Sequence, residues 1–207
     1  PEDMQTLFDE VIMPKIPEVL FSNTSGKAHL YVLKKEWFAL LEEKIEDADM
    51  TLAGDMYEHA IDTELHRGAI EDGKRADGRA MDEVRELYAQ AGGISPMLHG
   101  SGIFYRGETH MLSVLTLGGP DDSQVIDTIE ESGTKKQFIH HYNFPPFSVG
   151  EAGRVGGFNR RMIGHGSLAE KAIAAIIPPK EEFPYTIRLV SETMASNGSS
   201  SMGSVCG

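Results

Sequence analysis

The stretch that decides the fold is FPYTIRLVSETMASNGSSSMGSVCG, residues 183–207. Apart from Arg188, residues 185–190 are β-branched, aromatic or aliphatic, with alternate large side chains on one face, so they predict a strand that leaves a proline-marked turn. The loop Asn197–Ser201 follows, and the small residues after it indicate the start of a tightly packed helix. Unpaired amides and hydroxyls at such a loop bind phosphate or another anion. The end of the chain therefore predicts a strand, an anion-binding loop and a helix in succession.

The predicted loop belongs to a candidate phosphate site with three features. Serine hydroxyls line the loop, two guanidinium groups offer bidentate forks, and one imidazole exchanges a proton near neutral pH. These residues are Ser199, Ser200, Ser201, Arg160, Arg161 and His165. Each feature is weak alone, because glycine-serine loops are usually solvated turns, paired arginines usually serve solubility or ion pairs, and a histidine beside glycines usually packs or turns. Their coincidence favours a site.

A helix is predicted just after these basic residues. Ser167–Glu170 has the capping-box form, an apolar stripe continues to Ile177, and Pro178-Pro179 ends it. The predicted start comes soon after Arg161 and His165 in the chain. A second helix N-terminus is therefore expected beside the basic cluster.

The first third of the chain has a helical pattern. Apolar residues recur every three or four positions in residues 30–45 and, less regularly, in residues 52–65. Pro14 and Pro17 are expected to end an earlier short helix. This helical module is interpreted first as a spacer, with a linker domain or an interaction surface as alternatives.

The segment Glu71–Arg79 is the predicted domain boundary, because its glycines and charges make a poor core. Beyond it, residues 111–117 and 137–144 are predicted strands, each ended by a turn with proline. Residues 80–91 are ambiguous, since their propensity favours a helix while their apolar spacing suits a strand. Helices followed by strands indicate an α+β fold.

Composition is that of a soluble globular protein, and no apolar run is long enough to span a membrane. The acidic start differs from a signal peptide, so a cytoplasmic location is expected. The single cysteine excludes an intramolecular disulfide. The chain begins at Pro1 and stops inside a predicted helix, so we interpret it as a fragment of a longer protein.

The net charge of −13 does not exclude nucleic-acid binding, because most of the negative charge lies in the first third of the chain. Residues 154–165 contain three arginines and a histidine but no acid, which permits a local basic site. His140 and His141 would point to opposite faces of a strand and cannot chelate one metal. Neither a Walker loop nor a dinucleotide fingerprint is present.

Five colinear runs resemble the polynucleotide phosphorylases of bacteria. They are Arg75–Arg79, His99–Thr109, His141–Glu151, Arg160–Gly166 and Ser191–Gly207. The resemblance implies an α+β chain in which residues 1–72 are part of an all-helical linker domain. Residues 73–207 would be the first half of the second RNase PH-like domain, a ribosomal protein S5 domain 2-like β-α fold. It also implies that the ambiguous Val84–Ala91 segment is the opening strand of that domain.

The resemblance implies a reaction as well. Inorganic phosphate would attack the 3′-terminal phosphodiester of RNA and release a nucleoside diphosphate, reversibly, in mRNA degradation. By this resemblance Ser199, Ser200 and Ser201 bind the attacking phosphate, and Arg160 and Arg161 bind the RNA. His165 and Arg161 are the catalytic candidates, and Arg75 and Arg79 are weaker RNA-binding candidates.

The resemblance further implies Mg²⁺, with ligands downstream of Gly207, and single-stranded RNA entering a homotrimeric ring. RNA degradosome components are candidate partners, no membrane partner is expected, and the fragment alone should be inactive. Two alternatives remain open. One is a catalytically inactive RNase PH-like subunit that binds RNA as a scaffold, and the other is a hydrolytic or synthesis-only nucleotidyltransferase.

Overall fold

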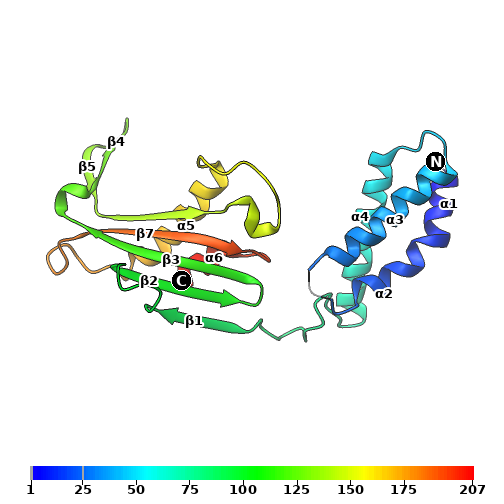
Figure 1. Ribbon diagram of the computed structural model, residues 1–207, viewed down its shortest axis with the longest axis horizontal. Helices are drawn as coiled ribbons and strands as arrows, with labels where there is room; N and C mark the ends of the chain where they lie inside the picture. The colour runs from blue at the N-terminus through cyan, green and yellow to red at the C-terminus, as the bar shows by residue number, and fades with distance from the viewer. Residues whose placement is uncertain (1, 25) are drawn as a thin grey trace. The chain divides into compact units, whose positions relative to one another are not determined.

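The computed structural model describes residues 2–24 and 26–207 and divides the chain into two compact units (Figure 1). Unit 1 comprises residues 1–84 and unit 2 comprises residues 85–207. Residues 73–84, which follow the boundary expected from the sequence, cluster with unit 1. Among the described residues, no helix has the length and apolarity needed to cross a bilayer.

Unit 1 is helical. Its helices are α1 (Glu2–Val11), α2 (Ile16–Leu20), α3 (Ala28–Lys44) and α4 (Met50–Glu71), with a short 3₁₀ turn at Met13–Lys15. The two longer helices confirm the periodic pattern of the first third. The prediction that Pro17 ends a helix is wrong, because Pro17 lies in the first turn of α2. A proline is tolerated there since its missing N–H would have no helical acceptor.

The core of unit 1 forms around Trp37, which is fully buried. The indole packs edge-on against Phe8, with ring centroids 5.0 Å apart, and its Nε1 donates to the Ala53 carbonyl at 3.1 Å. Tyr57 Oη donates to the Leu30 carbonyl at 2.8 Å, and burial raises the pKa of Tyr57 to about 12. Unit 1 therefore has a hydrophobic core of its own.

Unit 2 is a mixed sheet with helices on one face. The sheet has the order β1-β2-β3-β7-β6, and β6 and β7 are parallel while the other neighbours are antiparallel. The strands are β1 (Leu87–Ala91), β2 (Gly100–Arg106), β3 (Thr109–Gly118), β6 (Phe138–Asn143) and β7 (Thr186–Ala195). A separate hairpin pairs β4 (Gln124–Asp127) with β5 (Ser132–Lys136).

These strands confirm the α+β prediction. The predicted strands at 111–117, 137–144 and 185–190 all form, and within the ambiguous residues 80–91 a strand forms at Leu87–Ala91 only. Helix α6 (Ser200–Cys206) follows β7 after a short loop, as the final stretch of sequence predicts. Tertiary pairing of β1 with β2 overrides the helical propensity of residues 87–91.

Helix α5 (Arg160–Ala174) begins seven residues before the predicted start at Ser167. The side chain of Asn159 caps it by accepting from the Met162 amide at 2.8 Å, so the capping-box sequence lies inside the helix. The predicted apolar stripe is only partly buried. Ala169 is fully buried, whereas Leu168 is 47% and Ile176 80% exposed.

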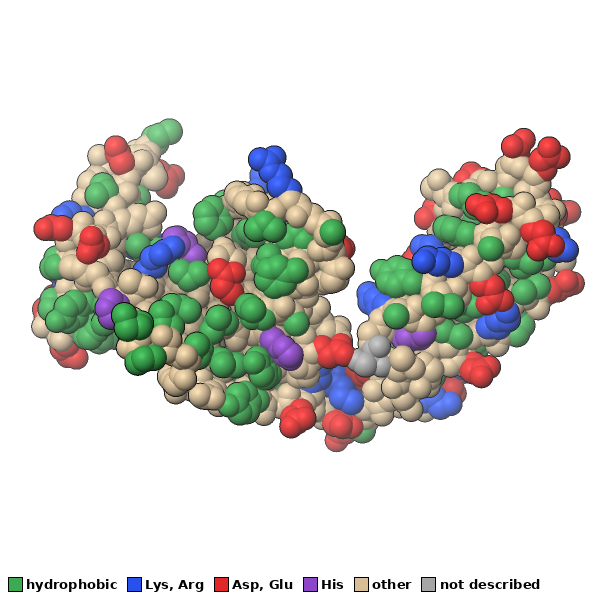
Figure 2. Space-filling view, in the orientation of Figure 1, with side chains coloured by type: hydrophobic (Ala, Val, Ile, Leu, Met, Phe, Trp, Pro, Cys, Tyr) green, Lys and Arg blue, Asp and Glu red, His purple; other side chains and the backbone are tan. Residues whose placement is uncertain are grey.

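Within unit 2, α5 and α6 pack on one face of the sheet, with α6 against β2, β3 and β7. The small core there contains Phe104, Met111 and Tyr142. Hydrophobic side chains also gather over the other face, as Figure 2 shows. On that face Tyr88 and Tyr105 are cross-strand partners, and their ring centroids lie 5.6 Å apart.

Candidate functional site

The parallel pairing of β6 with β7 sets the position of the candidate site. Asn143, the last residue of β6, pairs with Glu192 near the end of β7. Because parallel strands run in the same direction, the chain leaves both strands at one edge of the sheet. The segment that leads to Arg160 and the loop that leads to Ser200 therefore start from the same edge.

The loop after β7 turns sharply through two left-handed residues. Gly198 has φ 84°, and Ser199, the N-cap of α6, has φ 50° and ψ 37°. Helix α6 starts at Ser200, and the Gly203 amide donates to the Ser199 carbonyl at 3.1 Å. The amides of the first helical turn have no acceptor within the helix. This loop therefore offers N–H groups to a ligand.

The three predicted serines differ in exposure. Ser199 is exposed, Ser201 is half-buried, and Ser200 is 3% exposed. Ser200 Oγ lies 2.6 Å from the Oη of Tyr142, and either atom can donate. The hydroxyl of Ser200 therefore joins α6 to the buried end of β6.

The ring of Tyr142 also connects the loop to the basic residues of α5. His165 lies beside this ring at a centroid distance of 5.3 Å, and Phe144 stacks on it at 6.3 Å. The guanidinium of Arg161 lies 4.5 Å from the centroid of the Phe144 ring, within the range of a cation–π contact. Ser200 and Arg161 are thus joined by two aromatic rings on the helix-covered side of the sheet.

The basic cluster favours the neutral form of His165. Partial burial lowers the pKa of His165, and the positive charge of Arg161 lowers it further. Its Nδ1 is buried and has no hydrogen-bond partner among the described residues. Arg160 is exposed in the first turn of α5. A neutral imidazole beside the Arg161 guanidinium suits a site that receives an anion.

Arg75 and Arg79 have a different environment, in unit 1. Both guanidinium groups contact the carboxylate of Asp77, at 3.3 Å from Arg75 and 2.6 Å from Arg79. Both also donate to the carbonyl of Glu83 at 3.2 Å. These contacts hold the turn after α4, which belongs to unit 1, whereas the serine loop belongs to unit 2.

Sequence reasoning missed the residues that join the parts of the site. Tyr142 and Phe144 lie in the run that carries the resemblance, yet no spacing rule relates them to Ser200 or Arg161. Thr109, which is fully buried at the start of β3, contacts the loop through two hydrogen bonds. These contacts depend on strand order and register, which a single sequence does not display.

The residues present do not form a metal site. Within the part of the chain that the structure describes, no group of three or more His, Cys, Asp or Glu side chains could hold a metal ion. Two acidic side chains of this region already accept hydrogen bonds, Glu192 from Asn143 and Glu108 from Asn197. These residues therefore do not fit a Mg²⁺ site by themselves.

The family match and two similar curated proteins indicate the same class of enzyme. Residues 83–207 match the 3′ exoribonuclease family, domain 1 (RNase PH). The polyribonucleotide nucleotidyltransferase of Chlorobium phaeobacteroides (strain BS1) is 59% identical over 150 residues, which cover 72% of this chain and 20% of that protein. The polyribonucleotide nucleotidyltransferase of Caldicellulosiruptor bescii is 45% identical over 210 residues, which cover 100% of this chain and 29% of that protein.

A solved structure of the Archaeoglobus fulgidus exosome with RNA bound to the active site also matches, with 16% identity and a TM-score of 0.48. It covers 67% of this chain and 54% of that one. The chain thus spans less than a third of the length of these two curated relatives. The match to the family extends over more than half of the chain, and the chain therefore belongs to the 3′ exoribonuclease (RNase PH) family.

Proposed function

We propose that the full-length protein containing this chain is a phosphorolytic 3′-to-5′ exoribonuclease that degrades mRNA. The observation that carries the proposal is the chain of contacts from Ser200 through Tyr142 and Phe144 to Arg161. It joins an anion-binding loop to a basic helix within residues that match the 3′ exoribonuclease family. The relatives' name, polyribonucleotide nucleotidyltransferase, supports the same reaction class.

In the proposed reaction an oxygen of inorganic phosphate attacks the phosphorus of the last phosphodiester. A new P–O bond forms, the bond from that phosphorus to the 3′ oxygen of the preceding nucleotide breaks, and that oxygen becomes the new RNA end. The terminal nucleotide leaves as a nucleoside diphosphate. The reverse sequence adds nucleotides without a template and releases phosphate.

The residues have distinct roles in this proposal. The loop amides, with Ser199, Ser200 and Ser201, hold the attacking phosphate, and Arg160 and Arg161 hold the phosphate groups of the RNA end. Fixed donors bring two anions together with little reorganisation, which is how phosphoryl transfer is accelerated. His165 is positioned against Tyr142 beside Arg161 and supplies a neutral polar contact.

The remaining elements of the proposal depend on the whole protein. Mg²⁺ would lower the charge repulsion in the transition state, with ligands from parts of the protein outside these residues. Single-stranded RNA is the proposed substrate and the cytoplasm the proposed location. A homotrimeric ring and degradosome components are the proposed assembly and partners, and the isolated chain is proposed to be inactive.

The serine loop is tested in the full-length protein by replacing Ser199, Ser200 and Ser201 with alanine together. Diphosphate release is measured against phosphate concentration, and RNA affinity is measured separately. We expect the phosphate KM to rise about tenfold or more, the loss of roughly 1.4 kcal/mol of phosphate binding, while RNA affinity changes little. Ser167→Ala, at an exposed serine of α5, is the control. An unchanged phosphate KM in the triple variant contradicts the proposal.

The basic helix is tested by replacing Arg160 and Arg161 with aspartate together. Reversing two charges beside an RNA end should reduce degradation and the reverse polymerisation alike, because both directions use the same bound RNA. The control is Lys171→Asp, at an exposed lysine in the last turn of the same helix. It changes the net charge by half as much as the double variant. Normal rates in both directions for the double variant would show that the two arginines are only surface charges.

A further inference from the structure

Three side chains that have no role in the proposed reaction hydrogen-bond the backbone of the loop before α6. Arg85 lies just before β1, Arg106 ends β2 and Thr109 begins β3. Each of the three side chains hydrogen-bonds one or both of two consecutive residues of the loop, Asn197 and Gly198. These residues are separated from the loop by about 90 to 110 positions in sequence, so only the strand order brings them together.

Thr109 forms the centre of this arrangement. Its Oγ1 accepts from the amide of Asn197 at 3.0 Å and donates to the carbonyl of Gly198 at 3.1 Å. The side chain is fully buried, so water does not compete for either bond. One hydroxyl therefore fixes both ends of a two-residue segment.

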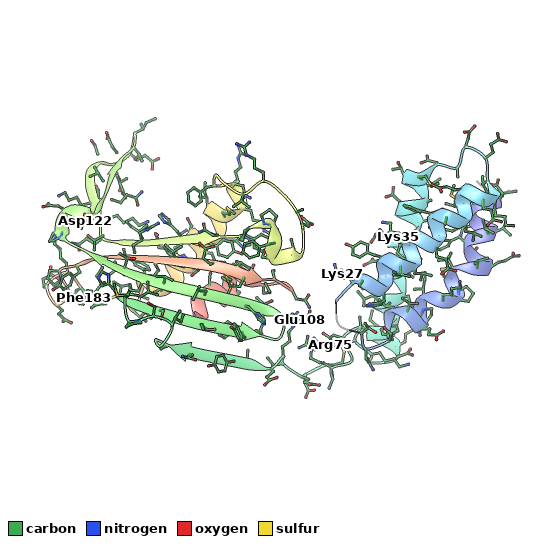
Figure 3. All side chains as sticks on the ribbon, viewed as in Figure 1. Lys27, Lys35, Arg75, Glu108, Asp122 and Phe183 are labelled. Atoms are coloured by element: carbon green, nitrogen blue, oxygen red, sulfur yellow. The ribbon has the colours of Figure 1, made fainter. Side chains whose placement is uncertain are left out.

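The two arginines act on the carbonyl oxygens of the same segment. Arg85 Nη1 donates to the carbonyl of Asn197 at 2.7 Å, and Arg106 Nη2 donates to the carbonyl of Gly198 at 2.9 Å. Glu108, labelled in Figure 3, accepts from the side chain of Asn197 at 2.9 Å. Charged donors make stronger hydrogen bonds than neutral ones, so both carbonyls are held toward the hairpin of β2 and β3.

The direction of these carbonyls determines the direction of the neighbouring amides. In a planar trans peptide the C=O and the following N–H point to opposite sides. With the Asn197 and Gly198 carbonyls turned toward the arginines and Thr109, the amides of Gly198 and Ser199 are turned the other way. The segment thus presents donors, and not carbonyl oxygens, to the side away from the hairpin.

The conformation that results is one that a free loop would rarely adopt. Ser199 has φ 50°, in the left-handed region that is unfavourable for residues other than glycine. The contacts at Asn197 and Gly198 come immediately before this residue and hold the backbone into it. A strained backbone conformation of this kind persists when several surrounding contacts together fix it.

We propose that Arg85, Arg106 and Thr109 are positioning residues that preorganise the Asn197–Ser199 loop for inorganic phosphate. This inference rests on the proposed function, because it takes the loop as the phosphate site. The three side chains do not touch the phosphate. They act through the backbone, by removing carbonyl oxygens from the anion and fixing the amides toward it.

The test uses Thr109→Val in the full-length protein, which keeps the shape of the side chain and removes the hydroxyl. The phosphate KM, kcat and RNA affinity are measured, together with the rise in melting temperature on adding inorganic phosphate. We expect the phosphate KM to rise about tenfold, because the amides of the loop are no longer held toward the phosphate. RNA affinity should be unchanged. Thr109→Ser restores the hydroxyl and should return the KM close to that of the parent protein.

Thr186→Val is the matched control. Thr186 is also buried at the start of a strand, and its Oγ1 donates to the carbonyl of Gly119 at 2.9 Å, away from the loop. If both valine variants raise the phosphate KM alike, the effect is general destabilisation and the proposal is overturned. Should Thr109→Val not fold, Arg106→Gln is compared with Arg106→Lys, and only the glutamine variant should raise the KM strongly.

The result also separates this inference from the proposed function. If the triple serine variant raises the phosphate KM and folded Thr109→Val does not, the positioning role is wrong and the phosphate loop stands. If the triple serine variant leaves the phosphate KM unchanged, the proposed function fails, and the positioning role fails with it. A rise in KM for Thr109→Val with rescue by serine supports both.

Discussion

Tyr142 is the residue that most directly links the parts of the proposed site. It is 1% exposed, and its hydroxyl and ring contact different elements, Ser200 in α6 and His165 in α5. A buried aromatic with one polar atom usually places that atom against a partner. The position of the serine loop relative to the basic helix therefore depends on one side chain in β6.

The hydroxyl pair of Tyr142 and Ser200 can be measured with a double-mutant cycle. Each single variant, Tyr142→Phe or Ser200→Ala, leaves the other hydroxyl buried without this partner and should cost about 1–3 kcal/mol. The double variant should cost less than the sum, with a coupling of roughly 0.5–1.5 kcal/mol. Urea-dependent hydrogen exchange of β6 peptides gives the free energies, and additive losses would show that the two hydroxyls are not coupled.

His140 is a second buried polar residue, and its contacts determine its tautomer. Nδ1 lies 3.3 Å from the carbonyl of Gly166, which can only accept, so Nδ1 carries the proton. Nε2 must then accept from Ser191 Oγ at 3.0 Å, and Ser191 Oγ lies 2.9 Å from Ser113 Oγ. Burial lowers the pKa of His140, because the charged imidazole would lose its water.

This arrangement gives a pH dependence with a definite sign. The folded-state pKa of His140 lies below 6.5, so below pH 6.5 the unfolded chain takes up more protons and stability falls as pH decreases. Hydrogen exchange of β6 and β7 peptides, corrected for intrinsic pH effects, should show less protection at pH 5 than at pH 7.5. His140→Phe should reduce this difference, whereas His59→Gln, at an exposed position of α4, should not.

At the scale of elements, local sequence patterns predicted the strands and long helices but not the start of α5. Alternation and turn residues are local properties, so residues 111–117 and 137–144 were correct as strands. Ser167–Glu170 has the form of a cap, but Asn159 caps the helix first. When one amphipathic segment contains two possible N-cap sequences, the tertiary contacts decide which of them begins the helix, and the sequence alone does not show those contacts.

Residue type and resemblance predict the proposed phosphate-binding and RNA-binding residues of the candidate site, but not the residues that support them. Glycine, serine and arginine are typical of anion binding, so Ser199 and Arg161 are candidates from the sequence. The roles of Tyr142 and Thr109 follow from the register of β6 and β3 against β7, which is set by pairing between residues 49 to 85 positions apart. Their residue types alone are equally compatible with ordinary core positions.

Helix α4 (Met50–Glu71) contains two glycines with opposite expected responses to alanine. A Cβ at Gly54 would meet Phe38 Cζ at 3.7 Å, an ordinary contact, whereas a Cβ at Gly68 would meet Phe21 Cζ at 2.2 Å. Gly54→Ala should stabilise unit 1 by up to about 1 kcal/mol through helix propensity. Gly68→Ala should destabilise it by roughly 1–3 kcal/mol because the ring must move.

The fluorescence of Trp37 measures both changes in the 207-residue chain during urea unfolding. The midpoint should rise for Gly54→Ala and fall for Gly68→Ala relative to the parent chain. The two variants are controls for each other, since they make the same chemical change on the same helix. Equal shifts in one direction would contradict the close approach of Phe21 to Gly68.

At the scale of the whole chain, each unit has a separate hydrophobic core, and the only tryptophan lies in unit 1. Because each unit has its own core, we expect each unit to unfold cooperatively by itself. Tyr142→Phe, in unit 2, should therefore leave the Trp37 unfolding midpoint of the 207-residue chain unchanged, while it lowers the stability of the sheet measured by hydrogen exchange. A shift of the Trp37 midpoint would show that the two cores unfold together.

Of the five strands in the sheet of unit 2, the one that is synthesised last, β7, lies in the interior of the sheet. β7 pairs with β3 on one side and with β6 on the other, although both partners precede it by many residues. While the ribosome is still translating the segment before Thr186, β3 and β6 each have an open edge that another nascent chain could pair with. Co-translational folding of this sheet must therefore wait for β7, and slower elongation before Thr186 would lengthen the period in which aggregation competes with folding.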